Sequence, residues 1–160
     1  MSPINGEEHM DPETLRRLVW VVPLAMAVAV TANAIFYFIL TRWLHIDLLI
    51  GGEEAERWWL PPVGDSETIL WQLPVSDIIL FSVVFASAAG VVFVIVSQIA
   101  QRPIHTYLKI ATVALFLSFI PPLSAPSPPV EMVVKLCLVA MHIIGAMAVV
   151  GVLVGLGRGS

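Results

Sequence analysis

The sequence contains four long apolar stretches that are almost free of charged side chains, and this feature limits the possible folds more than any other. The first stretch, from Leu18 to Thr41, has no charged residue over 24 positions. As a helix it would be about 36 Å long, and about 20 apolar residues are enough to cross the hydrocarbon core of a bilayer. The chain is therefore predicted to be an all-α integral membrane four-helix bundle, with spans at residues 18–41, 78–100, 105–120 and 132–156.

The composition agrees with a membrane location and leaves no room for a second globular domain. Hydrophobic residues make up 58% of the 160 residues and charged residues only 12%, which is unlike a soluble domain. We expect a cytoplasmic tail at residues 1–17, one transmembrane domain at residues 18–157 and one long outer loop at residues 43–76. Met1 to Glu13 is polar, acidic and interrupted by prolines, so we expect this part of the tail to be disordered.

A secretory signal peptide is the competing interpretation of the first stretch. Two arginines precede the apolar residues, and Ala32-Asn33-Ala34 resembles a small-residue cleavage site. The stretch nevertheless continues through Ile35 to Leu40, which is longer than the apolar core of a signal peptide, and the residues before it are acidic. A membrane span is therefore the favoured interpretation.

The outer loop combines acidic residues with tryptophan. Tryptophan prefers the headgroup level of a bilayer, where its ring is buried and its N–H stays hydrated. We therefore expect the loop to lie along the membrane surface, with a short interfacial helix from Glu53 to Leu60 that ends at Pro61-Pro62. The expected interface anchors are Trp43, Trp58, Trp59 and Trp71.

Prolines define the shorter connections. Gln101-Arg102-Pro103 is expected to make a tight turn between the second and third spans. Pro121-Pro122 is expected to end the third span, and the proline-rich residues 123–129 that follow are expected not to be helical.

The distribution of lysine and arginine predicts the orientation. Five of these residues lie near one set of span ends and three near the other, and cytoplasmic ends carry the excess. Both termini are therefore expected to be cytoplasmic, in the inner (plasma) membrane of the cell. The five are Arg16, Arg17, Arg102, Lys109 and Arg158, and the three are Arg42, Arg57 and Lys135.

Each expected span offers one polar side chain at a similar depth. From the cytoplasmic end of each span, Asn33, Ser87, Ser118 and His142 lie at about 22, 20, 20 and 21 Å. If these side chains face inward they form a polar layer, in which Asn33 and His142 could share a hydrogen bond. The layer serves either to fix helix register or, as the alternative, to form a ligand, haem or proton site at His142.

Several observations limit the chemistry of such a site. Bis-histidine haem needs a second intramembrane histidine, whereas His9, His45 and His105 lie outside the spans or at the interface. No carboxylate lies inside a span, and Cys137 is the single cysteine, which excludes an intrachain disulfide and a multi-cysteine metal site. Cys137 is interpreted as a small buried apolar side chain. Catalytic motifs are absent, so no catalytic or metal-binding residue is predicted and the cofactor stays unknown.

Small residues recur four positions apart in three of the spans, and such stripes let helix backbones approach closely. They are expected to pack within the bundle, with a dimer interface as the alternative. Lys109 and Lys135 are expected to extend toward the headgroups. The stripe residues are Ala25 and Ala29, Ser82, Ala86 and Gly90, and Gly151 and Gly155.

The chain resembles a group of uncharacterised bacterial four-transmembrane-helix proteins, known as a domain of unknown function. The resemblance covers Leu15 to Leu156 and depends on Arg16-Arg17 before Ala32-Asn33-Ala34, on Pro121-Pro122 and on His142 with Gly145-Ala146. The long tryptophan-rich loop departs from the shorter linker of that group. The resemblance implies a fold and a membrane location but no activity.

The sequence thus favours a non-enzymatic structural or accessory membrane subunit. The alternative is a carrier or binder of a small or lipid-like ligand in an intramembrane pocket around His142. The expected partners are the lipid bilayer and other membrane subunits or a homo-oligomer. The scattered basic residues and the formal net charge of −4 argue against nucleic acid.

Overall fold

The computed structural model describes residues 12–52, 69–124 and 130–157. Four helical segments in these ranges are long and apolar enough to cross a membrane, at Val19–Trp43, Val75–Ile99, Pro103–Ser124 and Met132–Leu156. The prediction of an all-α, four-helix membrane bundle is confirmed, and the protein is a multi-pass membrane protein.

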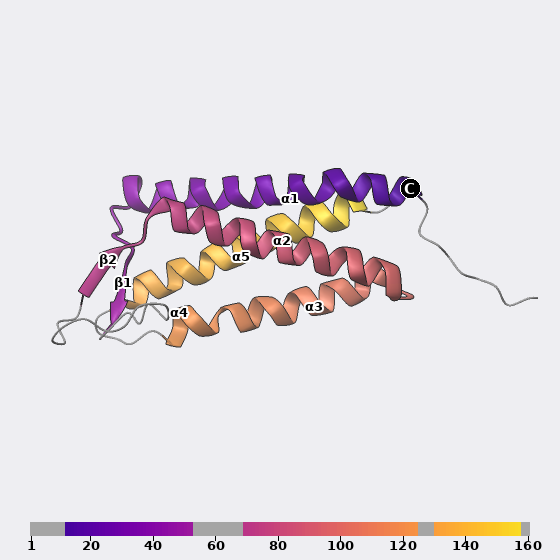
Figure 1. Ribbon diagram of the computed structural model, residues 1–160. Coiled ribbons are helices and arrows are strands. Elements are labelled where there is room, and N and C mark those ends of the chain that lie inside the picture. The colour runs from indigo at the N-terminus through magenta and orange to yellow at the C-terminus, as the bar shows by residue number, and fades with distance from the viewer. Residues whose placement is uncertain (1–11, 53–68, 125–129, 158–160) are drawn as a thin grey trace, which may run out of the picture.

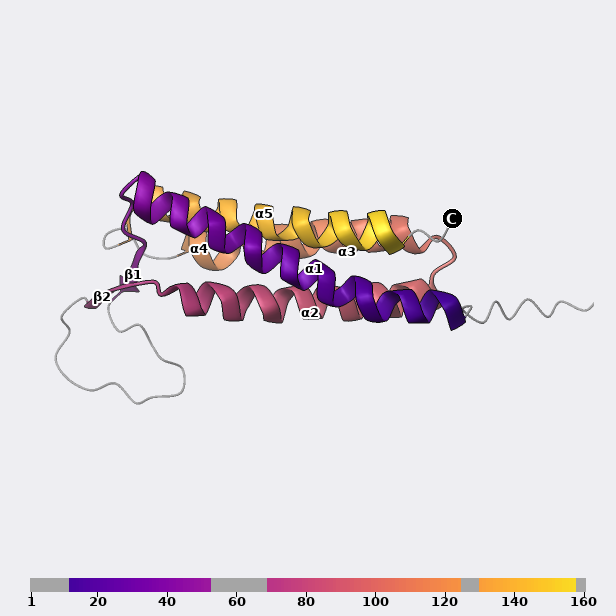
Figure 2. The same cartoon turned by 90° about the horizontal axis from the view of Figure 1, so that it is seen from above.

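The helices are α1 (Pro12–Phe38), α2 (Val75–Ile99), α3 (Pro103–Ser118), the short α4 (Ile120–Ser124) and α5 (Met132–Gly157). They lie side by side in one elongated bundle (Figure 1). The view from above shows α1 crossing between α2 and α5 (Figure 2). Helix α1 packs most extensively on α5 and α2, whereas α3 contacts α2 and α5 over smaller areas and lies at the side of the bundle.

Helix α1, together with the π-helical turn that follows it, extends beyond the predicted span at both ends. It begins at Pro12, so the last residues of the expected disordered tail are helical, and the rest of that tail lies outside the described residues. Proline suits a helix start because it lacks the N–H that would have no partner there. After Phe38 the helix widens into one π-helical turn, Ile39–Trp43. His45, with φ of 50°, then reverses the backbone and ends the helix.

The outer loop contains a feature that the sequence interpretation missed. Strands β1 (Leu49–Gly52) and β2 (Ile69–Gln72) pair antiparallel, with Leu49 opposite Gln72 and Gly52 opposite Ile69. The backbone N–H of Leu73 donates to the carbonyl of Leu48 at 2.9 Å and continues the pairing toward α2. The interfacial helix expected at Glu53 to Leu60 lies outside the described residues.

The third crossing does not end at its prolines, which corrects the prediction. The chain turns at Phe119 and resumes as α4, and Pro121 and Pro122 lie in the first turn of that short helix. Proline is tolerated there because first-turn N–H groups have no helical acceptor. Leu123 and Ser124, expected to be non-helical, therefore belong to α4.

Two buried clusters hold the bundle together, one toward each end. The cluster near the α2–α3 turn contains Tyr107 of α3, and the cluster near the strands contains Leu48 and Leu73, which flank the strands. Tyr107 packs edge-on against Phe93, with ring centroids 4.9 Å apart. These contacts attach α3 and the strand pair to opposite ends of the central helices.

Candidate functional site

A buried polar contact between helices joins Asn33 of α1 to Ser82 of α2. The Nδ2 amide of Asn33 donates to Oγ of Ser82 at 2.9 Å. Both side chains are buried, with 8% and 9% of their surface exposed. In hydrocarbon an unpaired amide would be costly, so this hydrogen bond fixes the position of α1 along α2.

Helix α5 approaches the same amide through Gly145. A Cβ atom at Gly145 would lie 3.0 Å from Nδ2 of Asn33, closer than most side chains tolerate. Glycine is therefore the residue that lets α5 pack against this side chain. We call Asn33, Ser82 and Gly145 the Asn33 junction, because it joins α1, α2 and α5 at one point.

One acceptor at the junction is unsatisfied. The Oδ1 atom of Asn33 is buried and has no hydrogen-bond partner among the described residues. An amide oxygen can accept two hydrogen bonds, so this atom can receive a donor from a small molecule or from a rearranged side chain. Its role is limited to accepting hydrogen bonds.

The other three residues of the expected polar layer bond to the backbone of their own helices. The Oγ of Ser87 donates to the carbonyl of Val83 at 2.6 Å. Likewise, the Oγ of Ser118 donates to the carbonyl of Leu115 at 2.7 Å. The structure thus gives Asn33 a different partner, Ser82, and shows no hydrogen bond that joins it to Ser87, Ser118 or His142.

The physical reason is helix register. Ser82 and Ser87 are five residues apart on α2, which is about 7.5 Å along the axis, so an error of little more than one helical turn in counting depth from span ends exchanges one for the other. The signal for the true partner was nonetheless in the sequence, because Ser82 shares a four-residue stripe with Ala86 and Gly90. That stripe marks the face of α2 that meets α1.

His142 has a defined hydrogen-bonding state in this arrangement. Its Nδ1 lies 2.7 Å from the carbonyl oxygen of Leu138, and a carbonyl only accepts, so Nδ1 carries the hydrogen. In a neutral ring Nε2 is then a bare acceptor. The ring is half-buried and lies against Phe85, with centroids 6.4 Å apart. His142 is thus held by its own helix and one aromatic neighbour.

The small-residue stripes divide into two classes. Ala25, Ala29 and Ala86 are buried, and a Cβ at Gly90 would come within 2.6 Å of Cγ1 of Val22. In contrast, a Cβ at Gly151 or Gly155 would meet no atom within 4 Å. The stripes of α1 and α2 therefore pack inside the bundle, whereas the stripe of α5 faces outward.

The residues expected at the membrane surface are described only in part. Trp43 is 83% exposed, and Trp20, which the sequence interpretation missed, is 74% exposed. Trp58 and Trp59 lie outside the described residues, and Trp71 belongs to β2 without a described side chain. Trp20 could have been found, since it lies two residues inside the first predicted span.

The two span lysines differ, which corrects the expectation that both extend toward the headgroups. Lys109 is exposed, but Lys135 is only 5% exposed at the strand end of the bundle. The most buried hydroxyl was also missed. Tyr107 is 1% exposed, and its oxygen has no hydrogen-bond partner within the part of the chain that is described.

The described residues were also compared with the side-chain groupings that metal binding and redox chemistry require. Within residues 12–52, 69–124 and 130–157, no three His, Cys, Asp or Glu side chains come close enough to hold a metal ion. Cys137 is half-buried and free. The described residues provide helix packing and two hydrogen-bond acceptors, Asn33 Oδ1 and, in a neutral ring, His142 Nε2.

Comparison with known proteins gives one family match, and it agrees with the resemblance noted from the sequence. The model of a family of unknown function (DUF6069) matches residues 13–158, which is nearly the whole chain. No curated protein and no solved structure shows significant similarity to the chain.

Proposed function

The chain belongs to the DUF6069 family of unknown function, and we propose that it is a structural or accessory subunit that contacts another membrane protein or a second copy of itself. It has no activity of its own in this proposal. Its inward-facing polar and small residues hold the bundle, and its outward-facing small residues make the contact.

The observation that carries the proposal is the difference between two pairs of glycines. Gly90 and Gly145 are in close contact with Val22 and Asn33, whereas Gly151 and Gly155 meet nothing. The outward pair is four residues apart on α5, so both glycines lie on one helix face. Bare backbone at this spacing lets a second transmembrane helix approach closely, and no contact within the described chain uses it.

The proposed orientation places both termini in the cytoplasm, in the inner (plasma) membrane. The start of α1, the α2–α3 turn and the end of α5 lie at the same end of the bundle (Figure 1). This end carries Arg102 and Lys109 together with Arg16, Arg17 and Arg158 in the sequence, and cytoplasmic ends are enriched in such residues. The strand pair then faces the opposite side.

Orientation is tested by labelling single cysteines in a Cys137→Ser background. Gln101 and Asp47 are exposed at opposite ends of the bundle, so Gln101→Cys and Asp47→Cys are matched probes. With a membrane-impermeant maleimide on intact cells, Asp47→Cys should be labelled and Gln101→Cys should not. Labelling of Gln101→Cys alone would reverse the orientation.

Site-specific crosslinking tests the contact itself. In the same Cys137→Ser background, Gly151→Cys is expected to form a disulfide-linked dimer or a crosslink to one partner of defined mass in native membranes. Ala88→Cys, on the exposed side of α2, is the control and should stay monomeric. Failure of Gly151→Cys to crosslink, together with purification of the protein in mild detergent as a colourless monomer, would contradict the proposal.

A second candidate function is binding of a small or lipid-like ligand near His142. It is favoured by the two acceptors, Asn33 Oδ1 and His142 Nε2, on the facing helices α1 and α5. The close approach of Gly145 to Asn33 favours the subunit function instead, because it leaves little space at that level. His142→Ala distinguishes the two functions. If the protein binds a ligand near His142, this variant should lose the bound compound or its absorbance, while Gly151→Cys in the same chain should still crosslink.

A further inference from the structure

Helix α3 presents a face on which basic residues are followed by apolar ones. Arg102, His105 and Lys109 are exposed. Arg102 immediately precedes the helix, and the four-residue spacing of His105 and Lys109 places these two on one side of it. Val113 and Leu117 continue the same side toward the middle of the bundle and are 58% and 59% exposed. The face therefore changes from cationic to apolar along the helix axis.

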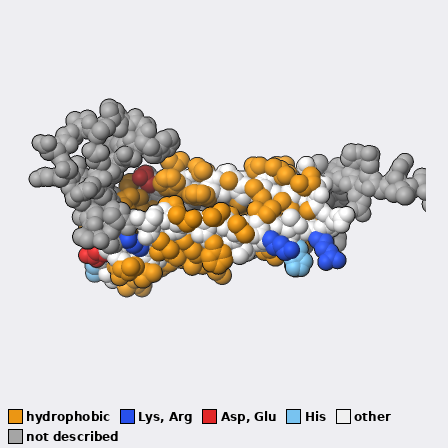
Figure 3. All heavy atoms as spheres, turned by 90° about the horizontal axis from the view of Figure 1, so that it is seen from below, with side chains coloured by type: hydrophobic (Ala, Val, Ile, Leu, Met, Phe, Trp, Pro, Cys, Tyr) orange, Lys and Arg blue, Asp and Glu red, His pale blue; other side chains and the backbone are white. Residues whose placement is uncertain are grey.

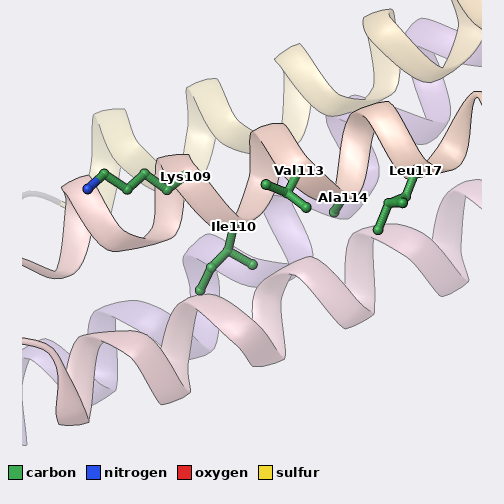
Figure 4. Close-up of a pocket in the computed structure, with 5 residues that line it drawn as sticks. All are labelled: Lys109, Ile110, Val113, Ala114 and Leu117. Carbon is green, nitrogen blue, oxygen red and sulfur yellow. The ribbon is translucent and has the colours of Figure 1, made fainter.

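A shallow, largely open groove runs along this face between side chains of α3 alone. Its volume is about 380 Å³, and its lining residues are Lys109, Ile110, Val113, Ala114 and Leu117 (Figure 4). The larger side chains form its walls, and Ala114 leaves the gap between Ile110 and Leu117. From Lys109 to Leu117 the helix rises about 12 Å, close to the thickness of about 15 Å of one hydrocarbon leaflet. The groove thus has the length of the part of an acyl chain that one leaflet contains.

The acidic residues whose side chains are described lie away from the basic end of this groove, and Glu13 in the first turn of α1 is the acidic residue of the described chain at the same end of the bundle. Asp47, Asp77 and Glu131, the acidic residues whose side chains are described, all belong to the opposite end of the bundle. Figure 3 shows basic side chains and a histidine together near one end of this face, with largely apolar surface between them and the other end, where blue, pale blue and red side chains also lie. The side chain of Lys109 extends away from Val113 and Leu117, toward the start of α3 (Figure 4). A cation placed in this way meets the headgroup layer.

We infer that this groove binds an anionic phospholipid of the leaflet at the α2–α3 turn. One acyl chain lies along Ile110, Val113, Ala114 and Leu117, and the phosphate is held by Arg102 and Lys109. His105 lies between them in the sequence, on the same side of α3 as Lys109. Basic groups at this position attract anionic headgroups, while the apolar groove orders the chain below them.

A second copy of the chain fits this face poorly. In a two-fold dimer about the membrane normal, the same residues of both α3 helices would meet at equal depth. Lys109 would then face Lys109, which is repulsive at the edge of a low-dielectric layer. A lipid brings the opposite charge instead, so the α3 face and the outward glycines of α5 are assigned different occupants.

The test measures lipids retained by the full chain. Protein in nanodiscs of equal parts dioleoyl-phosphatidylglycerol and dioleoyl-phosphatidylcholine is extracted in mild detergent, and bound lipid is quantified by mass spectrometry. Wild type should retain phosphatidylglycerol over phosphatidylcholine by at least about fivefold. Arg102→Gln and Lys109→Gln should each reduce this preference by about fivefold, because one basic residue near a membrane contributes about that much to the binding of an anionic lipid. Arg42→Gln, at the opposite end, should leave the preference unchanged.

A second pair of variants tests the groove without changing charge. Ala114→Leu fills the gap and should reduce the total retained lipid. Ala88→Leu is the matched control, because Ala88 precedes the end of α2 by the same eleven residues by which Ala114 follows the start of α3. The inference would be overturned if wild type retained the two lipids in the equal ratio of the nanodisc. It would also be overturned if Ala114→Leu and Ala88→Leu retained equal amounts of lipid. A dimer that forms in place of lipid binding and is lost in Ala114→Leu would also overturn it.

Discussion

The side of the bundle made by α1, α2 and α5 differs from the side made by α3, although all four crossings are apolar enough to span a membrane. Buried residues make up 22% of the most apolar part of α1 and of α2, but only 11% of that part of the α3–α4 crossing. The packed side contains the Asn33 junction and the close contact of Gly90 with Val22. On α3, the hydroxyls of Thr112 and Ser118 bond to the helix's own backbone.

The difference shows what distinguishes inward from outward faces in a membrane. Lipid tails are as apolar as leucine, so hydrophobicity alone does not drive one helix against another. Close packing of small residues and hydrogen bonds between helices do so instead. The comparison is therefore tested best by making the same substitution at a position packed between helices and at a position that faces outward.

The largest effect is expected at Gly90. Gly90→Ala places a Cβ within 2.6 Å of Val22, whose branched side chain has little rotamer freedom in a helix. The free energy of unfolding should fall by about 1–3 kcal/mol. Gly151→Ala is the matched control and should cause no loss in the monomeric protein, because its Cβ meets no atom of its own chain within 4 Å. Both are measured by unfolding in mixed detergent and dodecyl sulfate micelles; equal losses would contradict the division into packed and open glycines.

A smaller loss is expected at Gly145. Gly145→Ala brings a Cβ to 3.0 Å from the Asn33 amide, which must shift and strain its hydrogen bond to Ser82. The expected cost is about 1 kcal/mol. In an Asn33→Ala background the same substitution should cost less, since the crowded amide is gone. An undiminished cost in that background would show that Gly145 acts on another neighbour.

The hydrogen bond itself is expected to contribute less again. A double-mutant cycle of Asn33→Ala and Ser82→Ala should give a coupling energy of about 0.6 kcal/mol, the usual value for a polar pair between membrane helices. The same cycle with Ser87→Ala in place of Ser82→Ala should give a coupling near zero, because Ser87 bonds to the carbonyl of Val83. A larger coupling with Ser87 would restore the polar layer expected from the sequence.

The smallest effect is expected on α3. Ser118→Ala removes a hydroxyl that bonds only to the carbonyl of Leu115 on its own helix. The free energy of unfolding should stay within about 0.5 kcal/mol of wild type. If the loss instead equals that of Ser82→Ala, Ser118 has a partner on another helix, and α3 is held more tightly than the comparison states.

Much of the architecture could be predicted from the sequence, and the misses are local. The four crossings follow from uncharged length alone, since any other fold would leave backbone groups unsatisfied in lipid. The strand pair was missed because β1 contains two glycines, which weaken a strand pattern, and β2 is only four residues long. The helical Pro121-Pro122 was missed because proline ends one helix and starts another equally well.

The sequence by itself determined that the chain spans a membrane with four helices and which residues are small or polar enough to matter inside it. Only the tertiary structure decided how these residues are paired: Asn33 with Ser82, Gly145 against Asn33, and Gly151 with Gly155 facing outward. The physical reason is that hydropathy fixes which segments are in lipid, whereas a shift of a few residues along a helix axis changes every partner at almost no cost in hydropathy. The structure likewise decided that the α3–α4 crossing is the least buried of the four within the described chain and that α3 offers a shallow groove beyond its basic end.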